Sequence, residues 1–328
     1  MKVVNSKFLD ILFFVVTCLL NIGLVHAQTA YPSKPITMLI PFAAGGSTDV
    51  VARVLASVAE KSLGKSIVVV NRPGATGALA LTELSKAQPD GYTIAAVNET
   101  AVAIAPHMQK VSFDPLKDFT PIINFGVYTF FIAVSADSSF KTLKDLIDYA
   151  KANPRIVTVG IPGIGASAHL GMSRLMIENK AEVTFVPFPG GAPTTTALLG
   201  RHVSVASASG EVLPHVKSGK LRVLAMFVDS KLKEFPQIQS IKELGYNWSL
   251  NSWVGFGGPS GMDPVITNRL HDAFKKAMDS AEFKSTMDSF QMLTISDDPK
   301  KATDAYKRSF DDMGKIIKDL NLGIYAKP

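Results

Sequence analysis

The sequence predicts an α/β protein of about two domains, each built on a mostly parallel sheet flanked by helices. One observation is length, because 328 residues are more than a single hydrophobic core usually supports. A second is alternation: short apolar runs typical of strands are followed by longer segments whose apolar residues recur at helical spacing. A third is that Gly, Pro, Ser and Thr gather between these segments, where turns are expected. Repeated strand–helix units of this kind predict parallel strands.

The first run of strand–helix units covers about residues 36–97. Apolar residues from Val50 to Leu63 recur at helical spacing, and Gly64 follows them as a helix-ending residue. Asn71–Gly74 and Pro89–Gly91 are turn sequences. We expect, in order, a strand at 36–41, a helix at 48–63, a strand at 67–70, a helix at 77–86 and a strand at 92–97.

A second run begins near residue 130 with an apolar stretch. Thr142 stands where a helix N-cap is expected, and the loop Pro162–Ser167 leads from a strand into a helix. Trp253–Gly257 is expected to cross back, with Trp253 in the core or at a hinge. The expected strands are 130–134, 157–160, 183–186, 203–207, 221–228 and 253–257. The expected helices are 142–152, 167–179, 194–199, 264–279, 281–290 and 300–320.

The first 27 residues differ from the rest of the chain. Lys2 and Lys7 form a basic start, Ile11–Leu20 is apolar, and Val25-His26-Ala27 supplies small residues at the end. This order is typical of a cleaved secretory signal peptide, and the apolar run is short for a membrane span. The single cysteine, Cys18, lies in this segment, so we expect a mature periplasmic protein without disulfides.

Composition excludes several classes of function. Without Lys2, Lys7 and Asp10 the formal charge falls from +6 to about +5, and the excess is spread thinly. No basic stripe is interleaved with aromatic residues, so nucleic acid is not an expected partner. The histidines of the mature chain are scattered without the paired spacing of a metal site, so we expect no metal.

One motif occurs three times: a strand, a turn of small residues, and a helix that starts with Ser or Thr. The copies are Ala43–Asp49, Gly163–His169 and Pro189–Thr196. The first amides of a helix have no intrahelical partner and carry partial positive charge, so such turns favour anions. If each run of units is a domain, the first copy lies in one domain and the other two in the second. A ligand between them would be gripped from both sides.

The first copy offers several groups to a ligand. Gly45 and Gly46 allow close backbone approach and angles that other residues resist. Ser47 or Thr48 can cap the helix and still offer a hydroxyl. Asp49 falls in the first helical turn, where we expect it to cap the helix instead of meeting an anionic ligand.

The same loops raise three other interpretations, of which the phosphate loop fails and two enzymatic ones stay open. A phosphate loop needs a lysine after its last glycine, but Ser47 follows Gly46. Gly163–Ala168 fits a dinucleotide loop, yet an exported protein meets little free nicotinamide cofactor. A serine hydrolase would use Ser47 or Ser167 with His169 or His215, but neither serine lies in GxSxG. An exported hydrolase and a dinucleotide enzyme stay open as alternatives to a binding protein, for which no cofactor is expected.

Two segments at the start of the mature chain, Tyr31–Ile36 and Pro41–Ala56, resemble Bug-family proteins. These are extracytoplasmic solute receptors of tripartite tricarboxylate transporters. Similar motifs follow in the family's order and spacing along the whole mature chain. They are Val69–Ala75, Pro89–Thr93, Phe113–Phe119, Ser167–Leu170, Val186–Phe188, Gly190–Ala192, Glu211–His215, Gly219–Ala225 and Ser252–Gly255.

The resemblance implies a two-lobed, hinged binding protein of the type II Venus-flytrap fold. Lobe 1 would comprise 28–129 and 255–328, and lobe 2 would comprise 130–254. The family holds carboxylates on the loops that correspond to Phe42–Thr48 and Gly165–His169. Polar turns after strands, Asn98-Glu99-Thr100 and Ser207–Glu211, are expected near the same cleft. The predicted ligand-binding residues are Phe42, Ala44, Gly45, Gly46, Ser47, Thr48, Thr100, Gly165, Ser167, Ala168, His169, Gly190 and Ser209.

This chain departs from the family's pattern at two places. Many members carry an aspartate near 208 that receives amino or hydroxyl groups, whereas Ala208 stands here, which argues against an ammonium-bearing ligand. Phe188-Pro189-Gly190 replaces the family's usual Tyr-Lys-Gly and removes a cationic contact. We expect a monomeric periplasmic receptor, not an enzyme, that passes a di-, tri- or aromatic carboxylate to a membrane permease. A receptor that signals instead stays open.

Overall fold

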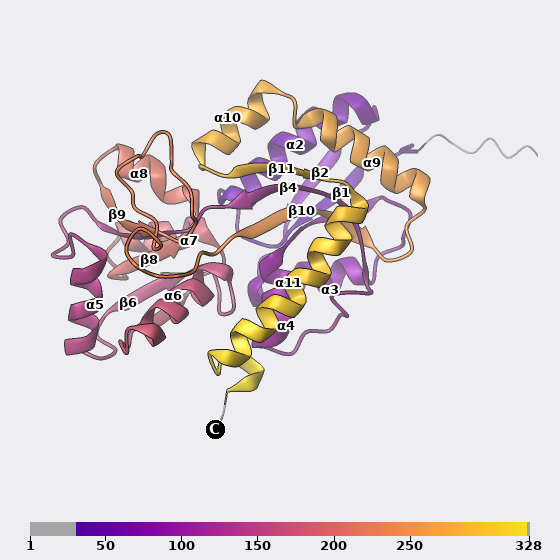
Figure 1. The fold of residues 1–328 in the computed structure, drawn as a ribbon. Coiled ribbons are helices and arrows are strands. Elements are labelled where there is room, and N and C mark those ends of the chain that lie inside the picture. Colours follow the sequence, from indigo (N-terminus) through magenta and orange to yellow (C-terminus); the bar gives the residue numbers. More distant parts are fainter. Residues whose placement is uncertain (1–30, 327–328) are drawn as a thin grey trace, which may run out of the picture. The chain divides into compact units, whose positions relative to one another are not determined.

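The computed structural model describes residues 31–326, and the predicted leader at 1–27 lies outside them. From Lys34 onward the described chain forms one compact unit. This unit contains two sheets, each flanked by helices (Figure 1). The two-lobed α/β architecture expected from the sequence is confirmed.

The first sheet has six strands in the order β11-β4-β10-β3-β1-β2. β1 pairs in parallel with β2 and β3, and the crossovers between them contain helices, as the alternating pattern predicted. β10 pairs antiparallel with β3 and β4, and β11 with β4. The strands are β1 (Ile36–Ile40), β2 (Ile67–Asn71), β3 (Thr93–Asn98), β4 (Phe119–Tyr128), β10 (Ser252–Pro259) and β11 (Leu293–Asp297).

Helices cover both faces of this sheet. α2 packs with α9 and α10 on one face, while α3 and α11 lie on the other (Figure 1). Asp263, Ser280 and Asp298 cap the last three helices, each accepting a hydrogen bond from an amide of the first turn. The helices are α2 (Ser47–Leu63), α3 (Ala78–Ser85), α4 (Ala105–Met108), α9 (Pro264–Ala277), α10 (Ala281–Ser289) and α11 (Pro299–Asp319).

The second sheet has five strands in the order β7-β6-β8-β5-β9. Its core contains Phe131, Ala206 and Met226 from the strands together with Leu198 and Leu213 from α7 and α8. α5 and α6 lie on the opposite face (Figure 1). The strands are β5 (Phe131–Ser135), β6 (Thr158–Ile161), β7 (Thr184–Pro187), β8 (Val205–Ala208) and β9 (Leu221–Met226). The helices are α5 (Leu143–Ala152), α6 (Ser167–Glu178), α7 (Gly191–Leu199) and α8 (Leu213–Lys217).

The predicted "mostly parallel" pairing needs correction, because both sheets are mixed. β6 pairs in parallel with β7 and β8, but β5 pairs antiparallel with β8 and β9. The physical reason is the path between the sheets: β4 runs into β5 through Thr129 and Phe130 alone, and the chain returns after β9 into β10. The strands that connect the two sheets, β4, β5 and β10, therefore pair antiparallel with their neighbours.

Several short elements complete the described chain. Turns of 3₁₀ helix lie at Ala75–Gly77, Gly210–Val212 and Gly323–Tyr325, and a π-helical turn lies at Thr100–Ile104. Trp253 is in the core of the first sheet, stacked on Tyr306 with ring centroids 4.5 Å apart. The lobe boundaries predicted at 129/130 and 254/255 stay predictions, and β10 itself begins at Ser252.

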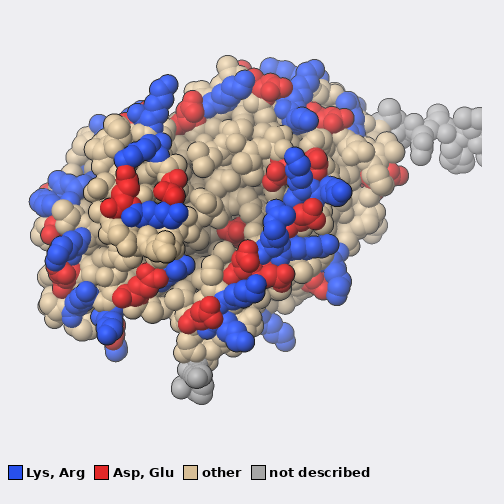
Figure 2. Space-filling model, viewed as in Figure 1, with Lys and Arg blue, Asp and Glu red and all other residues tan. Residues whose placement is uncertain are grey.

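The face drawn in Figure 2 shows no concentration of one charge. Figure 2 shows Lys and Arg interspersed with Asp and Glu on this face, and a central zone with few charged side chains. Within residues 31–326, no helix combines the length and apolarity needed to cross a membrane.

Candidate ligand-binding pocket

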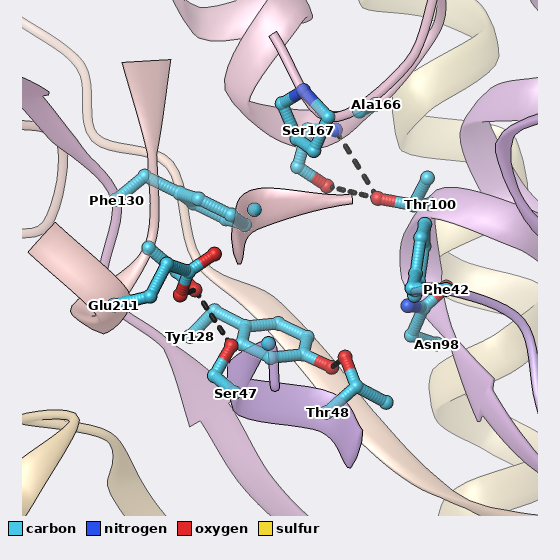
Figure 3. A pocket seen from close by; sticks show the side chains of 14 residues that line it. Phe42, Ser47, Thr48, Asn98, Thr100, Tyr128, Phe130, Ala166, Ser167 and Glu211 are labelled. Atoms are coloured by element: carbon cyan, nitrogen blue, oxygen red, sulfur yellow. Dashed lines mark hydrogen bonds between the residues drawn. The ribbon is translucent and has the colours of Figure 1, made fainter. Parts of the chain in front are cut away.

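One pocket is lined by residues from both sheets and their helices (Figure 3). The space open to the centres of water molecules is about 40 Å³, which exceeds the roughly 10–15 Å³ that one water needs. It is therefore a real but narrow cavity. Its lining residues are Phe42, Gly46, Ser47, Thr48, Asn98, Thr100, Tyr128, Phe130, Pro162, Ala166, Ser167, Gly191, Ser209 and Glu211.

The N-terminus of α2 forms one wall of the pocket. Gly46 is the N-cap and supplies no side chain, so the first amides of α2 have no side-chain cap. The expectation that Ser47 or Thr48 caps this helix is wrong, because both lie inside the helix. Gly45 has φ +83°, a conformation that favours glycine.

Asp49 bonds to the loop before α2 and to two neighbouring side chains. Its carboxylate accepts hydrogen bonds from Gly45 N at 3.0 Å, from Arg53 Nε at 2.9 Å and from Asn71 Nδ2 at 2.8 Å. Burial alone would raise the pKa of Asp49, but these hydrogen bonds and the Arg53 charge lower it. Asp49 therefore fixes the loop before α2, and the expectation that it caps the helix is wrong, because Gly46 is the N-cap and has no side-chain cap bond.

The N-terminus of α6 meets the first lobe at Thr100. Ala166 is the N-cap and has no side-chain cap bond. Ser167 N donates to Thr100 Oγ1 at 3.1 Å, and the hydroxyls of the two residues lie 2.8 Å apart. Ser167 Oγ also donates to Ser252 Oγ at 2.9 Å. The loop before α6 is thus joined to Thr100, just after β3, and to Ser252, the first residue of β10, and both strands belong to the first sheet.

The N-terminus of α7 is the third wall of the pocket. Gly190, with φ +139°, is its N-cap and has no side-chain cap bond. Ala43 N donates to Pro189 O at 2.9 Å, so the loop before α2 touches the loop before α7. The three copies of the sequence motif therefore converge on one pocket, two from one lobe and one from the other.

Capping distinguishes these helices from the others of similar length. Among described helices of nine or more residues, α5, α9, α10 and α11 have an N-cap side chain that accepts an amide hydrogen bond. α2, α6 and α7 have none. Helix ends without an N-cap side chain are suited to a ligand with negative oxygens, but in α6 the Ser167 amide already donates to Thr100 Oγ1.

A carboxylate of the protein also lies in the pocket. Ser209 Oγ donates to Glu211 Oε2 at 2.6 Å, and the hydroxyls of Ser47 and Ser209 lie 2.7 Å apart. Burial raises the pKa of Glu211, and hydrogen bonds from Ser209 and Ser47 oppose that shift. Among the described residues that line the pocket, none is Lys, Arg or His.

Aromatic side chains close the remaining walls. Tyr128, at the end of β4, is buried and its hydroxyl lies 2.6 Å from Thr48 Oγ1. Its ring lies 5.7 Å from that of Phe130, and Phe42 faces them across the pocket (Figure 3). Burial raises the pKa of Tyr128, so it stays neutral and acts as a hydrogen-bonding apolar wall.

The pocket contains seven of the thirteen residues predicted as ligand-binding. These are Phe42, Gly46, Ser47, Thr48, Thr100, Ser167 and Ser209. The other six, Ala44, Gly45, Gly165, Ala168, His169 and Gly190, are not among its lining residues. Most of the six neighbour a lining residue in sequence and shape the loops from which it projects.

His169 has a structural contact instead of a place in the pocket. Its Nδ1 accepts a hydrogen bond from Gly165 N at 3.1 Å, and its ring packs edge-on against Phe185. Burial lowers the pKa of His169 to about 4, so it is neutral at physiological pH. The hydroxyls of Ser47 and Ser167 bond to other hydroxyls, which leaves the hydrolase alternative without a serine–histidine pair at this pocket.

Sequence reasoning did not single out several lining residues. Tyr128 ends β4, a strand that the sequence analysis did not predict because Pro121 and Gly126 interrupt its apolar pattern. Pro162, Ala166 and Gly191 line the pocket through backbone and small side chains, which carry little sequence signal. Asn98 ends β3 and Glu211 lies in a 3₁₀ turn, and both belong to segments that were expected near the cleft.

Comparison with known proteins decides the family. Residues 51–322 match the family described as "Tripartite tricarboxylate transporter family receptor". A Cupriavidus necator relative, "UPF0065 protein in gbd 5'region", is 39% identical over 279 residues, which are 84% of this chain and 85% of the relative. The chain belongs to this receptor family. It is a solute-binding receptor and not an enzyme.

Two solved structures have a fold similar to that of this receptor. The periplasmic binding protein BugD is 27% identical, with a TM-score of 0.86 over 89% of this chain and 99% of that one. MatC from Rhodopseudomonas palustris, solved with bound malate, is 24% identical, with a TM-score of 0.83 over 88% of this chain and 100% of that one. The receptor fold thus extends over nearly the whole described chain.

Proposed function

We propose that this receptor binds a small organic carboxylate in the pocket between its lobes and delivers it to a tripartite tricarboxylate-type permease. The observation that carries the proposal is the convergence of three helix N-termini without side-chain caps on one pocket. Their amides can hydrogen-bond carboxylate oxygens, each bond to a charged group being worth about 1.5–3 kcal/mol before losses. A few such bonds suffice for micromolar affinity, about −8 kcal/mol.

Closure of the two lobes would couple to ligand binding. The first lobe bonds the second at the pocket through Ser47 to Ser209 and Thr100 to Ser167, and outside its lining through Thr76 Oγ1 to Ile164 O. The cavity of about 40 Å³ is too narrow for a dicarboxylate to enter while these bonds persist. A ligand would dock on the open lobes and favour closure because only the closed form offers amides from both.

The remaining parts of the proposal follow from the family and the leader. Removal of residues 1–27 on export would place the mature chain in the periplasm, where a permease could receive its ligand. We propose that it acts there as a monomer. The lobe assignment of 28–129 with 255–328 and of 130–254 would make Thr129, Phe130 and the 252–254 region the hinge.

A thermal-shift screen of the mature chain against organic acids tests the proposal. The malate bound by MatC makes C4 dicarboxylates the first probes. A ligand at 100 times its Kd adds about 2.7 kcal/mol of stability, which corresponds to a rise in Tm of roughly 4–5 °C for a chain of about 300 residues. NAD should give no rise, and a chromogenic ester should not be hydrolysed. Stabilisation by NAD, with none by any organic acid, would contradict the proposal.

A further inference from the structure

The hydroxyl groups beside Glu211 have a defined hydrogen-bond direction. Ser209 has one hydroxyl proton, and it is donated to Glu211 Oε2 at 2.6 Å. The 2.7 Å contact between the hydroxyls of Ser47 and Ser209 therefore requires Ser47 to be the donor there. Both protons point toward Glu211, so the pocket meets oxygen lone pairs at this place. Ser47 Oγ is then an acceptor for a ligand and cannot donate to a ligand's carboxylate.

Packing fixes the Glu211 carboxylate at the pocket wall. A Cβ added to Gly191 would lie 1.2 Å from Glu211 Oε1, so only glycine at 191 leaves room for this side chain. Gly191 and Glu211 both line the pocket, and Figure 3 shows the Glu211 carboxylate facing it beside Ser47. Within residues 31–326, no Lys or Arg forms an ion pair with Glu211.

The pocket therefore has two chemically different ends. The N-terminus of α6 suits the negative oxygens of a carboxylate, whereas the side chains of Glu211, Ser209 and Ser47 present only acceptors beside the first residues of α2 and α7. A second carboxylate placed against Glu211 would bring two negative charges together without a cation. A ligand hydroxyl or ammonium group there would donate to Glu211 instead.

We propose that Glu211 is a specificity-determining residue that selects carboxylates bearing a hydrogen-bond donor, a hydroxyl or an ammonium group, close to the carboxylate. This inference rests on the proposed carboxylate-receptor function. It replaces the expectation, drawn from Ala208, that an ammonium-bearing ligand is disfavoured, because the acidic group stands at 211 instead of near 208. A ligand without the donor leaves the Glu211 carboxylate desolvated and unmatched, which discriminates strongly between otherwise similar ligands.

Matched C4 ligands test this inference by isothermal titration calorimetry. Succinate has no donor, malate adds one hydroxyl, and aspartate adds one ammonium group at the same carbon. For the wild type, we expect malate or aspartate to bind at least tenfold more tightly than succinate. A larger gain for aspartate than for malate would identify the donor as ammonium, and the reverse would identify it as hydroxyl.

Two substitutions of Glu211 test how far the ligand preference depends on its charge and on its acceptor oxygens. Glu211→Gln removes the charge but keeps one acceptor, and Glu211→Met removes both acceptors with little change in side-chain length. The preference for malate or aspartate over succinate should fall from tenfold or more to about threefold in Glu211→Gln and should vanish in Glu211→Met. The affinity for succinate should stay the same or rise in both variants. Glu182→Gln, an exposed residue of the same lobe paired with Arg155, is the matched control and should keep the wild-type preference. Circular dichroism and Tm confirm that each variant folds.

The outcomes separate the two proposals. If succinate, malate and aspartate bind the wild type equally, or Glu211→Gln keeps the full preference, the role of Glu211 is overturned while the receptor function stands. If none of the organic acids in the wider screen binds the wild type, the receptor function fails and the Glu211 role falls with it. If succinate binds more tightly than malate and aspartate, Glu211 does not select donors.

Discussion

At the scale of single residues, the two glycines of the first loop have different roles. The sequence marked both for unusual backbone angles, but only Gly45 has positive φ, at +83°. Gly46 has φ −76°, which any residue adopts. A Cβ on Gly46 would meet no heavy atom closer than 3.7 Å, an ordinary contact distance.

This difference predicts unequal effects of alanine substitution. Gly45→Ala should weaken carboxylate affinity about five- to thirtyfold, because a non-glycine residue in this conformation costs roughly 1–2 kcal/mol and the loop must shift. Gly46→Ala, its matched control one position on, should change affinity less than about threefold. Calorimetry on both variants measures the contrast. Equal effects would show that close approach to the ligand, not backbone conformation, explains both glycines.

Pocket residues were predictable from the sequence where neighbouring residues in the chain determine their position. Ser47, Thr48 and Ser167 follow small-residue turns, and that pattern alone predicted that they lie at helix starts, where they now line the pocket. Glu211 could not be assigned from sequence because its position depends on Gly191, a residue 20 positions away, leaving the space that its carboxylate fills. Tyr128 was missed for the same reason: its contact with Thr48 is non-local.

At the scale of elements, the turn before α6 is joined to the turn after β3. Thr100 Oγ1 accepts the amide of Ser167 at 3.1 Å and contacts its hydroxyl at 2.8 Å. Both residues are buried. Two hydrogen bonds at one buried point make this contact a strong candidate for stabilising the closed form.

Thr100→Val should therefore favour the open form. The change keeps the side chain's shape but removes the acceptor, leaving the Ser167 amide without its partner, at a cost of about 1–3 kcal/mol. We expect ligand affinity to fall roughly 5- to 100-fold, with a larger radius of gyration at subsaturating ligand in X-ray scattering. Thr184→Val, which removes an exposed bond to Arg155 O within one lobe, should alter neither measurement. A fall in affinity with unchanged scattering would mean that Thr100 contacts the ligand without affecting closure.

Element boundaries followed the sequence closely, whereas strand pairing did not. The helices at Ser47, Ser167 and Leu143 begin within one or two residues of their predicted starts, because N-caps and turns are set by neighbouring residues. β11 and β4 were not predicted, and the antiparallel pairing of β10 with β3 and β4 was not foreseen. Pairing joins segments more than a hundred residues apart, and no short pattern encodes it.

At the scale of the whole molecule, two buried ionisable groups give opposite pH dependence. Burial raises the pKa of Glu99 from 4.5 to about 7; hydrogen bonds from Ser309 and Ser252 oppose this rise and the Asp312 charge adds to it. Its stabilising contribution is therefore fully present below about pH 4.5 and is lost as pH rises through 7. Burial lowers the pKa of His169 from 6.5 to about 4. Its contribution is present above pH 6.5 and is lost as pH falls through 4.

Between about pH 4.5 and 6.5 these two contributions should nearly cancel. On unfolding in this window, Glu99 releases a proton and His169 takes one up, so the pair adds little slope to the free energy of unfolding. Glu99→Gln removes the Glu99 titration and leaves that of His169. The free energy of unfolding should then rise with pH by up to about 1.4 kcal/mol per pH unit relative to wild type. His169→Asn, whose side-chain oxygen can still accept from Gly165 N, should tilt the dependence the other way by a similar amount.

Urea unfolding at pH 4.5, 5.5 and 6.5 measures these slopes. All other titrating groups are common to the variants, so each slope is read as a difference from wild type. The double variant Glu99→Gln/His169→Asn should recover the wild-type dependence, because both titrations are then absent. If the free energy of unfolding of each single variant changes with pH in parallel with that of wild type, neither side chain changes its proton affinity on folding. In the expected result, the two single variants change the pH slope of the free energy of unfolding in opposite directions, with no change left in the double variant. That result would show that the opposed titrations of Glu99 and His169 cancel in the wild type.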